Sequence, residues 1–504
     1  MKRLILGLIA FCFLPLPAGA EESASPVPAD LVAGPAKGPW RRLFLDAMVV
    51  EQSKGLQRVF HPVRKYEGNP VLRADKPYET SKRSTGPYLY GTVLRDQERL
   101  RMWYHLIHQG TYCNAYAEST DAIHWTKPDL GLIEFDGNTQ NNLFLSVLKD
   151  SPERVSSPQR GRCHNPSVIK QSGAEDPQKR YALFCYGADC GTARVAYSPD
   201  GLRWTFVEET CEKGLFPTSD VVNFFYDPYT SQYVATRKLS NRRGRAVGVA
   251  VSSDGLEWKL PVEEPVFVAD DLDPDATQIY GMPVFPYQGL YIGLPWIYHA
   301  RYFKYGDYRV DRLYDAQSDS PNTMDVQLAW SWDLVNWTRR RTPFVPLGEE
   351  GDWDSKMVVT ARSPIVLGDR LGFYYGGFDS PHDTSGDNPS GIGLATLRLD
   401  GFCSMRAEDG EGWLISRREP MRTPRIQINA RTNEGGSIAA EILDAKNRVL
   451  EGFSRKDCIP FQGDSVDHTL RWKSDRFPEE RLEEDKKIRF FISKGELFSY
   501  LPEF

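Results

Sequence analysis

Hydrophobic and polar positions alternate in short stretches along this chain. Four of these stretches are followed by the same seven-residue motif, which we call the repeated phrase. The phrase runs Ser-x-Asp, three further residues and a tryptophan, and its copies end at Trp125, Trp204, Trp258 and Trp337. Each copy follows a β-rich run, and two copies contain Asp-Gly, which is typical of a tight turn between antiparallel strands. We therefore predict that each phrase forms the outer hairpin of one repeated sheet.

The spacing of these repeats predicts a β-propeller. The tryptophans lie 79, 54 and 79 residues apart, which suits a four-stranded blade with variable loops and is too irregular for a solenoid. A degenerate fifth copy at 393–402 keeps Asp400-Gly401 but has Phe402 in place of a tryptophan. The predicted class is all-β, and the five innermost strands are expected at 86–94, 166–170, 221–226, 280–285 and 358–367.

A second domain is predicted after the propeller, which we place at 41–401. Residues 402–504 contain alternating stretches at 425–430, 437–443 and 489–492, a pattern typical of an antiparallel β-sandwich. Two short strands are also predicted at 42–46 and 49–51. They either close the propeller ring or pack on the second domain.

The N-terminus has the features of an export signal. Residues 1–20 carry Lys2-Arg3, an apolar run to Leu14 and the small residues Ala18-Gly19-Ala20, as in a secretory signal peptide. Residues 21–40 are rich in Ala, Pro, Ser and Gly and are expected to form a linker. No later stretch is long and apolar enough to span a bilayer. We expect an exported protein, periplasmic or extracellular.

Composition narrows the classes of partner and cofactor. The net charge of −6 over 504 residues argues against nucleic acid as a partner. Seven cysteines follow the predicted signal, so at least one thiol stays unpaired, and a bridge between Cys185 and Cys190 is one of the pairings left open. No metal-site spacing is present, so no cofactor is expected to be required. Calcium at the propeller axis is left open without a ligand motif to support it.

The candidate site lies where the inner strands begin, because these ends converge on one mouth of a propeller. Several acids fall there, and carboxylates at a polar, aromatic-lined mouth suit cleavage of a glycosidic bond. Asp220 and Asp354 are the preferred catalytic carboxylates, with Glu79, Asp271 or His164 as a third member. The predicted substrate-binding residues are Arg83, Tyr88, Arg162, Asn223, Gln278, Tyr280, Lys356, Thr360, Arg362 and His382.

Four of these residues bear on the charge of the ligand. Arginine recognises carboxylate and sulfate groups bidentately, so a sulfated or uronic-acid-containing polysaccharide is one interpretation and a phosphate is another. Pairing with the acids of the same mouth is the structural alternative. The four residues are Arg83, Arg162, Lys356 and Arg362.

Several motifs resemble those of five-bladed glycoside hydrolases of families 32, 43 and 117, and above all exported bacterial proteins similar to family 32. The likeness covers nearly all of the mature chain and is carried by residues 43–46, 69–72, 223–228, 280–285, 353–355 and 464–466. The catalytic motifs of family 32 are absent, since only Glu79 precedes the first inner strand and Arg162-Cys163-His164-Asn165 stands where an acid is expected. The histidine acid of family 117 implies such a role for His164 or His382.

The predicted function is therefore a secreted glycoside hydrolase acting on a poly- or oligosaccharide. A non-catalytic carbohydrate-binding propeller is the alternative, because the departures from the family 32 motifs favour a site that has lost its catalytic acids. A sialidase fits less well, since Asp200-Gly201 and Asp254-Gly255 are adjacent here, whereas the sialidase motif separates Asp and Gly. A scaffold for protein interactions is a further alternative.

Overall fold

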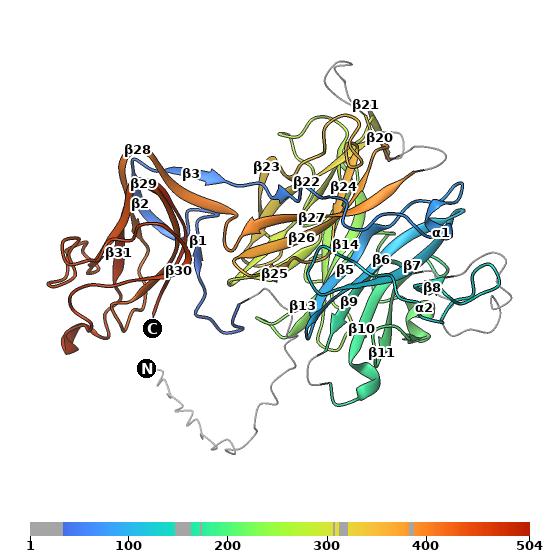
Figure 1. The fold of residues 1–504 in the computed structure, drawn as a ribbon, viewed down its shortest axis with the longest axis horizontal. Coiled ribbons are helices and arrows are strands. Elements are labelled where there is room, and N and C mark those ends of the chain that lie inside the picture. Colours follow the sequence, from blue (N-terminus) through green and yellow to red (C-terminus); the bar gives the residue numbers. More distant parts are fainter. Residues whose placement is uncertain are drawn as a thin grey trace, which may run out of the picture.

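The computed structural model describes residues 34–146, 163–171, 174–305, 308–311, 321–382 and 388–503. These residues are nearly all β, which confirms the predicted all-β class, and Figure 1 shows them as two lobes of strands. The described helices are short: α1 (Pro77–Thr80), α2 (Glu209–Lys213) and 3₁₀ turns at Pro177–Lys179 and Glu479–Arg481. No helix in these ranges is long and apolar enough to cross a membrane. The predicted signal peptide and residues 21–33 of the predicted linker lie outside them.

Three separate antiparallel sheets follow one another along the first half of the chain. The first contains β5 (Tyr88–Asp96), β6 (Arg99–His108), β7 (Thr111–Ser119) and β8 (Leu143–Ser146), in that order. The second contains β9 (Cys163–Lys170), β10 (Tyr181–Gly187), β11 (Thr192–Ser198) and β12 (Thr205–Phe206), and the third contains β13 (Val222–Asp227), β14 (Gln232–Asn241) and β15 (Gly244–Ser252). Each sheet begins at a predicted inner strand.

The strands predicted for the fourth and fifth repeats join in one sheet. One half contains β16 (Thr277–Gly281), β17 (Val284–Tyr287), β18 (Leu290–Gly293), β19 (Trp296–His299), β22 (Thr323–Ser331) and β23 (Trp337–Val345). The other half contains β24 (Met357–Thr360), β25 (Ile365–Leu367), β26 (Arg370–Phe378), β27 (Ser390–Arg398) and the early strand β4 (Arg64–Lys65). The halves meet through one parallel pair, Met324 with Met357. A hairpin of β20 (Tyr302–Tyr305) and β21 (Tyr308–Asp311) stands beside them.

The second lobe is a seven-stranded sheet that includes the first strands of the chain. It contains β28 (Cys403–Ser416), β29 (Ile426–Leu443), β30 (Asp464–Leu470) and β31 (Lys487–Pro502), together with β1 (Arg42–Leu43), β2 (Val50–Lys54) and β3 (Gln57–Phe60). In Figure 1 these early strands, drawn in blue, lie against the orange and red C-terminal strands. Of the two predicted alternatives for residues 42–51, packing on the second domain is therefore the one observed.

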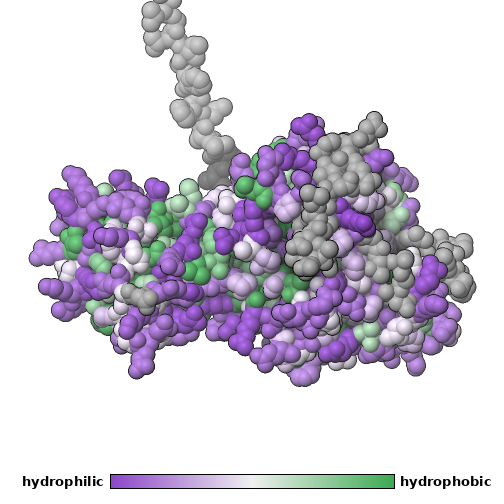
Figure 2. Space-filling view, turned by 90° about the horizontal axis from the view of Figure 1, so that it is seen from above, coloured by the Kyte–Doolittle hydropathy of each residue, from purple (hydrophilic) through white to green (hydrophobic). Residues whose placement is uncertain are grey.

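The two lobes share buried contacts. One cluster of buried hydrophobic side chains runs from Ile428 in the C-terminal sheet through Phe402 to Tyr287 in β17. Beside it, Asp400 accepts hydrogen bonds from the Tyr287 hydroxyl at 2.7 Å and the Ser499 hydroxyl at 2.6 Å. The outer surface contrasts with this core, since the face shown in Figure 2 is mostly hydrophilic with small hydrophobic patches.

The repeated phrase forms the same hydrogen-bonded turn four times, which confirms the predicted tight turns. In one copy, Ser198 Oγ donates to Asp200 Oδ1 at 3.0 Å, and the same carboxylate oxygen accepts the backbone N–H groups of Leu202 and Arg203 at 2.8 Å each. Burial raises the pKa of Asp200, but these donors outweigh burial and leave the pKa below its usual range. The other copies are built on Ser119 and Asp121, Ser252 and Asp254, and Ser331 and Asp333.

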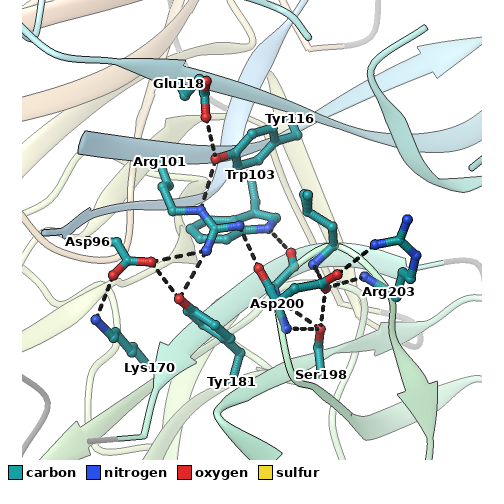
Figure 3. A network of polar contacts seen from close by, with 12 residues as sticks. Asp96, Arg101, Trp103, Tyr116, Glu118, Lys170, Tyr181, Ser198, Asp200 and Arg203 are labelled. Carbon is teal, nitrogen blue, oxygen red and sulfur yellow. Dashed lines mark hydrogen bonds and ion pairs between the residues drawn. The ribbon is translucent and has the colours of Figure 1, made fainter. Parts of the chain in front are cut away.

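Side chains of the first sheet hold the turn of the second sheet (Figure 3). The guanidinium of Arg101 in β6 donates to the backbone oxygen of Asp200 at 2.7 Å and to the Tyr181 hydroxyl at 3.0 Å. It also lies 4.9 Å from the ring centre of Trp103, whose indole N–H donates to the Gly201 oxygen at 2.6 Å. We call this group, Arg101, Trp103, Tyr181, Asp200 and Gly201, the Arg101 clamp.

The last sheet holds the turn of the first in a comparable way. The Tyr374 hydroxyl in β26 donates to the Ala122 oxygen at 2.7 Å, and the Tyr374 ring meets Trp125 edge to face at 5.4 Å. Neighbouring sheets thus contact one another in chain order, and the last contacts the first.

The inner strands are joined by side chains that bond to the backbone of the next sheet. Asn165, at a φ of 64°, donates from Nδ2 to the Tyr90 oxygen at 3.0 Å and accepts the Val222 N–H at 2.8 Å. Thr92 Oγ1 accepts the Val168 N–H at 2.9 Å. These bonds fix the starts of β5, β9 and β13 side by side, where the candidate site lies.

One disulfide is present in the described residues, between Cys190 and Cys211. Its presence overturns the pairing of Cys185 with Cys190 that the sequence left open. Cys185 is instead one of five buried free cysteines in these ranges, with Cys113, Cys163, Cys403 and Cys458. The prediction of at least one unpaired thiol is thus confirmed.

The Arg101 clamp predicts a difference between two conservative substitutions. Arg101→Lys should lower the free energy of unfolding by about 2–3 kcal/mol, because the compact ammonium cannot reproduce the planar fork by which the guanidinium reaches Asp200, Tyr181 and Tyr116 together, and buried acceptors are left unpaired. Arg99→Lys is the matched control: Arg99 is 61% exposed and pairs with Glu118, so its loss should stay below about 0.5 kcal/mol. Denaturant unfolding of both variants checks this, and equal losses would contradict it.

Candidate functional site

A buried lysine lies at the centre of the residues that gather where the inner strands begin. Lys238 in β14 is 5% exposed, and its Nζ lies 2.7 Å from Asp220 Oδ1. The same Nζ lies 4.0 Å from the ring centre of Tyr280 in β16. One ammonium therefore holds a carboxylate from the third sheet and an aromatic ring from the fourth repeat.

Both members of this pair are charged at neutral pH. Burial lowers the pKa of Lys238 to about 8, with Asp220 opposing the change. Burial also raises the pKa of Asp220, but attraction to Lys238 outweighs it and brings the pKa to about 2. The Asp220 side chain is 39% exposed. It is thus an ionised carboxylate that solvent or a ligand can reach.

His164 in β9 approaches Asp220 from the other side. Its Nδ1 lies 2.5 Å from the Asp220 backbone oxygen, and because a carbonyl only accepts, Nδ1 carries the proton and Nε2 carries the lone pair. Burial lowers the pKa of His164, which keeps the ring neutral. The ring packs 4.7 Å from Tyr112 and 4.9 Å from His105, centre to centre.

His105 supports this face of the site from within the core. It has no exposed surface, and its Nδ1 lies 3.1 Å from Asn114 Nδ2. Its Nε2 has no hydrogen-bond partner in the described part of the chain. Burial lowers the pKa of His105 well below its usual range, so a second neutral ring lies edge to face against His164.

Tyr280 links the lysine to a second histidine. The Tyr280 hydroxyl lies 2.9 Å from His382 Nε2 and is also hydrogen-bonded to Tyr90. Burial raises the pKa of Tyr280 above its usual range, so the hydroxyl stays protonated. Next to it, Arg245 donates to Gln278 Oε1 at 2.7 Å, with its guanidinium carbon 5.5 Å from the Tyr280 ring centre.

Aromatic rings line one side of the site. Tyr90 stacks on Trp296 at 5.1 Å and meets Tyr88 edge to face at the same distance. The Trp296 indole N–H donates to Thr360 Oγ1 at 3.1 Å, which fixes the ring. We call the whole group the Lys238 cluster, and its members are Tyr88, Tyr90, His105, Tyr112, His164, Asp220, Lys238, Arg245, Gln278, Tyr280, Trp296, Thr360 and His382.

Of the residues predicted from sequence, the structure brings seven to this cluster. His164 and Asp220 touch each other, Tyr280 touches His382, and Tyr88 and Gln278 contact neighbouring members. Thr360 joins through Trp296. The catalytic roles assigned to Asp220 and His164 stay predictions.

The other predicted acids have partners of their own. Asp354 is buried and accepts from Lys65 Nζ at 2.6 Å and from the Tyr375 hydroxyl at 2.9 Å. Glu79 is buried in α1 and accepts from Lys127 Nζ at 2.6 Å and from the Tyr104 hydroxyl at 2.8 Å. These two carboxylates are engaged in internal ion pairs.

Asp271 and the remaining predicted binding residues are not members of the Lys238 cluster, and they differ in exposure and in partners. Asp271 is exposed and pairs with Arg243 at 2.7 Å. Lys356 pairs with Glu350 at 2.6 Å. The rest divide by exposure: Asn223 and Arg362 are buried, Arg83 is exposed with a φ of 63°, and Arg162 lies outside the described residues.

Sequence reasoning missed the lysine at the centre. Lys238 lies in β14 and Arg245 in β15, on either side of the turn between the two strands, and in the sequence Lys238 follows Thr236 and Arg237 in a polar stretch that does not single it out. Tyr90 lies inside a predicted inner strand, and His105 and Trp296 lie in the observed strands β6 and β19, where an aromatic residue is ordinarily part of the core. Their contacts with the site come from neighbouring sheets, which a single strand pattern does not reveal.

Two hollows lie at opposite ends of the strands. The larger, of about 820 Å³, is lined by residues that include Asp96, Arg101, Lys170, Tyr181 and Asp200, at the ends of β5 and β9 far from their first residues. The smaller, of about 630 Å³, lies beside the first residue of β16, Thr277, on the side of the Lys238 cluster. The smaller pocket therefore lies near the site along the chain.

No family model matches this chain, and no curated protein matches it. Solved structures that resemble it include a glycosyl hydrolase from Bacteroides ovatus, at 16% identity over 68% of this chain and 94% of the other, with a TM-score of 0.44. Another belongs to work on GH130 mannoside phosphorylases and hydrolases that target β-1,2 mannosidic linkages in Candida mannan, at 15% identity, 68% and 94% coverage and a TM-score of 0.44. A third is an N-acetylgalactosamine deacetylase from F. plautii, at 15% identity, 69% and 97% coverage and a TM-score of 0.38. At these scores, function has to be argued from the site itself.

The Asp220–Lys238 pair predicts a pH-dependent effect on stability. The folded pKa of Asp220, about 2, lies below the usual value, so its contribution is present above about pH 4 and lost as the pH falls toward 2. Asp220→Asn should therefore destabilise the fold at pH 7, by about 1 kcal/mol or less because solvent screens the partly exposed pair, and less at pH 3.

Chemical denaturation of the wild type and the variant at both pH values measures this difference. Asp271→Asn is the control, since it removes a carboxylate that is almost fully exposed and should follow the wild type at both. A loss for Asp220→Asn that is equal at pH 7 and pH 3 would show that the charge pair is not its cause.

Proposed function

We propose that this protein is an exported glycoside hydrolase that cleaves a poly- or oligosaccharide at the Lys238 cluster. The proposed scaffold is a five-bladed β-propeller followed by a β-sandwich, periplasmic or extracellular after loss of residues 1–20. The circular order of contacts between the sheets, from the first to the last and back to the first, supports the propeller. No cofactor is part of the proposal.

The observation that carries the proposal is the state of Asp220. It is an ionised, partly exposed carboxylate held by the Lys238 ammonium, in a site whose other members are mainly aromatic rings and neutral hydrogen-bonding groups. Glycosidic cleavage needs a carboxylate that activates water or attacks the sugar, and aromatic faces suit the apolar faces of sugar rings. With a pKa near 2, Asp220 serves as base or nucleophile and not as the proton donor.

The neighbouring groups supply positioning and hydrogen bonds. Lys238 keeps Asp220 ionised and oriented, and His164 binds its backbone oxygen. The protonated Tyr280 hydroxyl and His382 offer hydrogen bonds to sugar oxygens. Asp354 as the acid that protonates the leaving oxygen stays a prediction from the sequence.

A non-catalytic carbohydrate-binding protein is the alternative, and one observation favours it. Glu79 and Asp354 are both held in buried ion pairs, so Asp220 is the carboxylate that the described contacts place in the cluster. An anionic ligand, sulfated or uronic, is part of the proposal because Lys238 and Arg245 place two cations beside the Tyr280 ring.

Sugar release by the purified mature protein tests the proposal. A panel of neutral, uronic-acid and sulfated polysaccharides should include one that yields sugar, and Asp220→Asn should lower that rate by ~10²–10⁴-fold. Asp354→Asn should lower it comparably if Asp354 is the acid. Binding without release, unchanged by Asp220→Asn, would support the alternative.

The ionisation of Lys238 should set the alkaline limb of the pH–activity profile. Lys238 has a pKa of about 8, so above that pH the cation is lost, Asp220 is no longer held, and kcat/KM should fall. Lys238→Met should abolish the limb and lower activity at pH 7, whereas Lys238→Arg should move the limb to higher pH. A wild-type profile flat to pH 10 would contradict this role.

A further inference from the structure

The smaller pocket lies beside the Lys238 cluster and has not been assigned a role. Its volume is about 630 Å³, within the ~300–1,000 Å³ of ordinary ligand sites. Its walls are the turn between β14 and β15 and the segment that leads into β16, lined by Arg242, Arg243, Ala269, Asp270, Asp271, Asp273, Pro274, Asp275, Ala276 and Thr277.

Two chain segments connect this pocket to the cluster. Thr277 lines the pocket, and Tyr280 stands only three residues further along the same strand, about 10 Å away. On the other wall, Arg243 is separated by one glycine from Arg245, which binds Gln278 at the cluster. The pocket and the cluster are therefore close neighbours along two segments of the chain, within the span of a few units of a chain-like ligand.

One buried hydroxyl group in a residue of the pocket wall lacks a hydrogen-bond partner among the described residues. Thr277 is 3% exposed, and its Oγ1 has no hydrogen-bond partner among the described residues. A buried hydroxyl without a partner is unfavourable, and native structures usually satisfy such groups with protein, water or ligand. Thr277 is also a lining residue of the pocket, so a ligand group there can provide the partner.

The other lining groups suit a hydroxyl-rich ligand. Asp271 and Arg243 form an exposed ion pair at 2.7 Å, and the Asp273 carboxylate accepts from Arg341 at 2.8 Å. Donors and acceptors of both charges are thus interspersed, which favours neutral hydroxyl groups over a ligand of one strong charge.

We propose that this pocket is a second sugar-binding subsite, which takes the units of an oligosaccharide that extend beyond the bond at Asp220. The inference rests on the proposed glycosidase function and adds to it that the substrate is a chain longer than a disaccharide. Thr277 Oγ1 hydrogen-bonds a sugar hydroxyl in this subsite.

The test is binding and turnover as a function of chain length. The mature protein carrying Asp220→Asn is titrated with cello-, manno- and galacturono-oligosaccharides of two to six residues, and the protein with native Asp220 is assayed on the same series. For the series that binds, affinity should rise at least tenfold between two and five residues. Thr277→Val should weaken binding of the longer members about 3–10-fold, the usual effect of one lost hydrogen bond.

Thr277→Val is a suitable variant because it retains the shape of the side chain. Its thermal stability should equal or exceed that of the wild type, because an unpaired buried hydroxyl is replaced by a methyl group. Arg203→Ala is the matched control, since Arg203 pairs with Asp200 on a distant turn and is largely exposed. It should leave the length dependence unchanged.

The outcomes separate the subsite from the catalytic proposal. Turnover with no dependence on chain length, and no effect of Thr277→Val, overturns the subsite and leaves the glycosidase. Length-dependent binding that Thr277→Val weakens, without turnover by the protein with native Asp220, supports the subsite and overturns the glycosidase. A Thr277→Val loss equal for all lengths overturns the subsite as well.

Discussion

Hydrogen bonds from the side chains of one sheet to the backbone of the next are the interaction on which this structure depends. Asn165 bridges Tyr90 and Val222 across three inner strands, and the Arg101 clamp holds the turn of the second sheet from outside. Separate sheets have no shared hydrogen-bond ladder, so packing alone would leave their relative positions loosely defined. Side-chain bonds at both ends fix them, and a site assembled from several sheets needs that precision.

The relative positions of the sheets also affect the electrostatics of the site. Lys238 is nearly fully buried, and removing a lone ammonium from water is strongly unfavourable. Asp220 from the preceding segment and the Tyr280 ring from another sheet compensate for that burial. The contact with Tyr280 spans two sheets, so this part of the compensation depends on how the sheets are packed.

The sequence predicted the repeated elements well and the connections between them less well. The four Ser-x-Asp turns were predicted correctly because every bond in them lies within seven residues, as Ser198 and Asp200 illustrate. The joining of residues 42–60 to the C-terminal sheet, and of the fourth and fifth repeats through Met324 and Met357, depends on contacts between distant segments. Strand patterns carry no information about such partners.

The same distinction applies to the candidate acids. Position before an inner strand selected Glu79, Asp220 and Asp354 alike, but position does not determine which carboxylate has an internal partner on every side. Glu79 accepts from Lys127, Tyr104 and two backbone N–H groups, and Asp354 accepts from Lys65 and Tyr375, so both are largely saturated and buried. Asp220 differs because its lysine partner is more deeply buried than the carboxylate itself. The Asp220 carboxylate is stabilised by a buried lysine and is still exposed to solvent. A substrate can therefore reach Asp220, whereas the buried Glu79 and Asp354 carboxylates only support the fold.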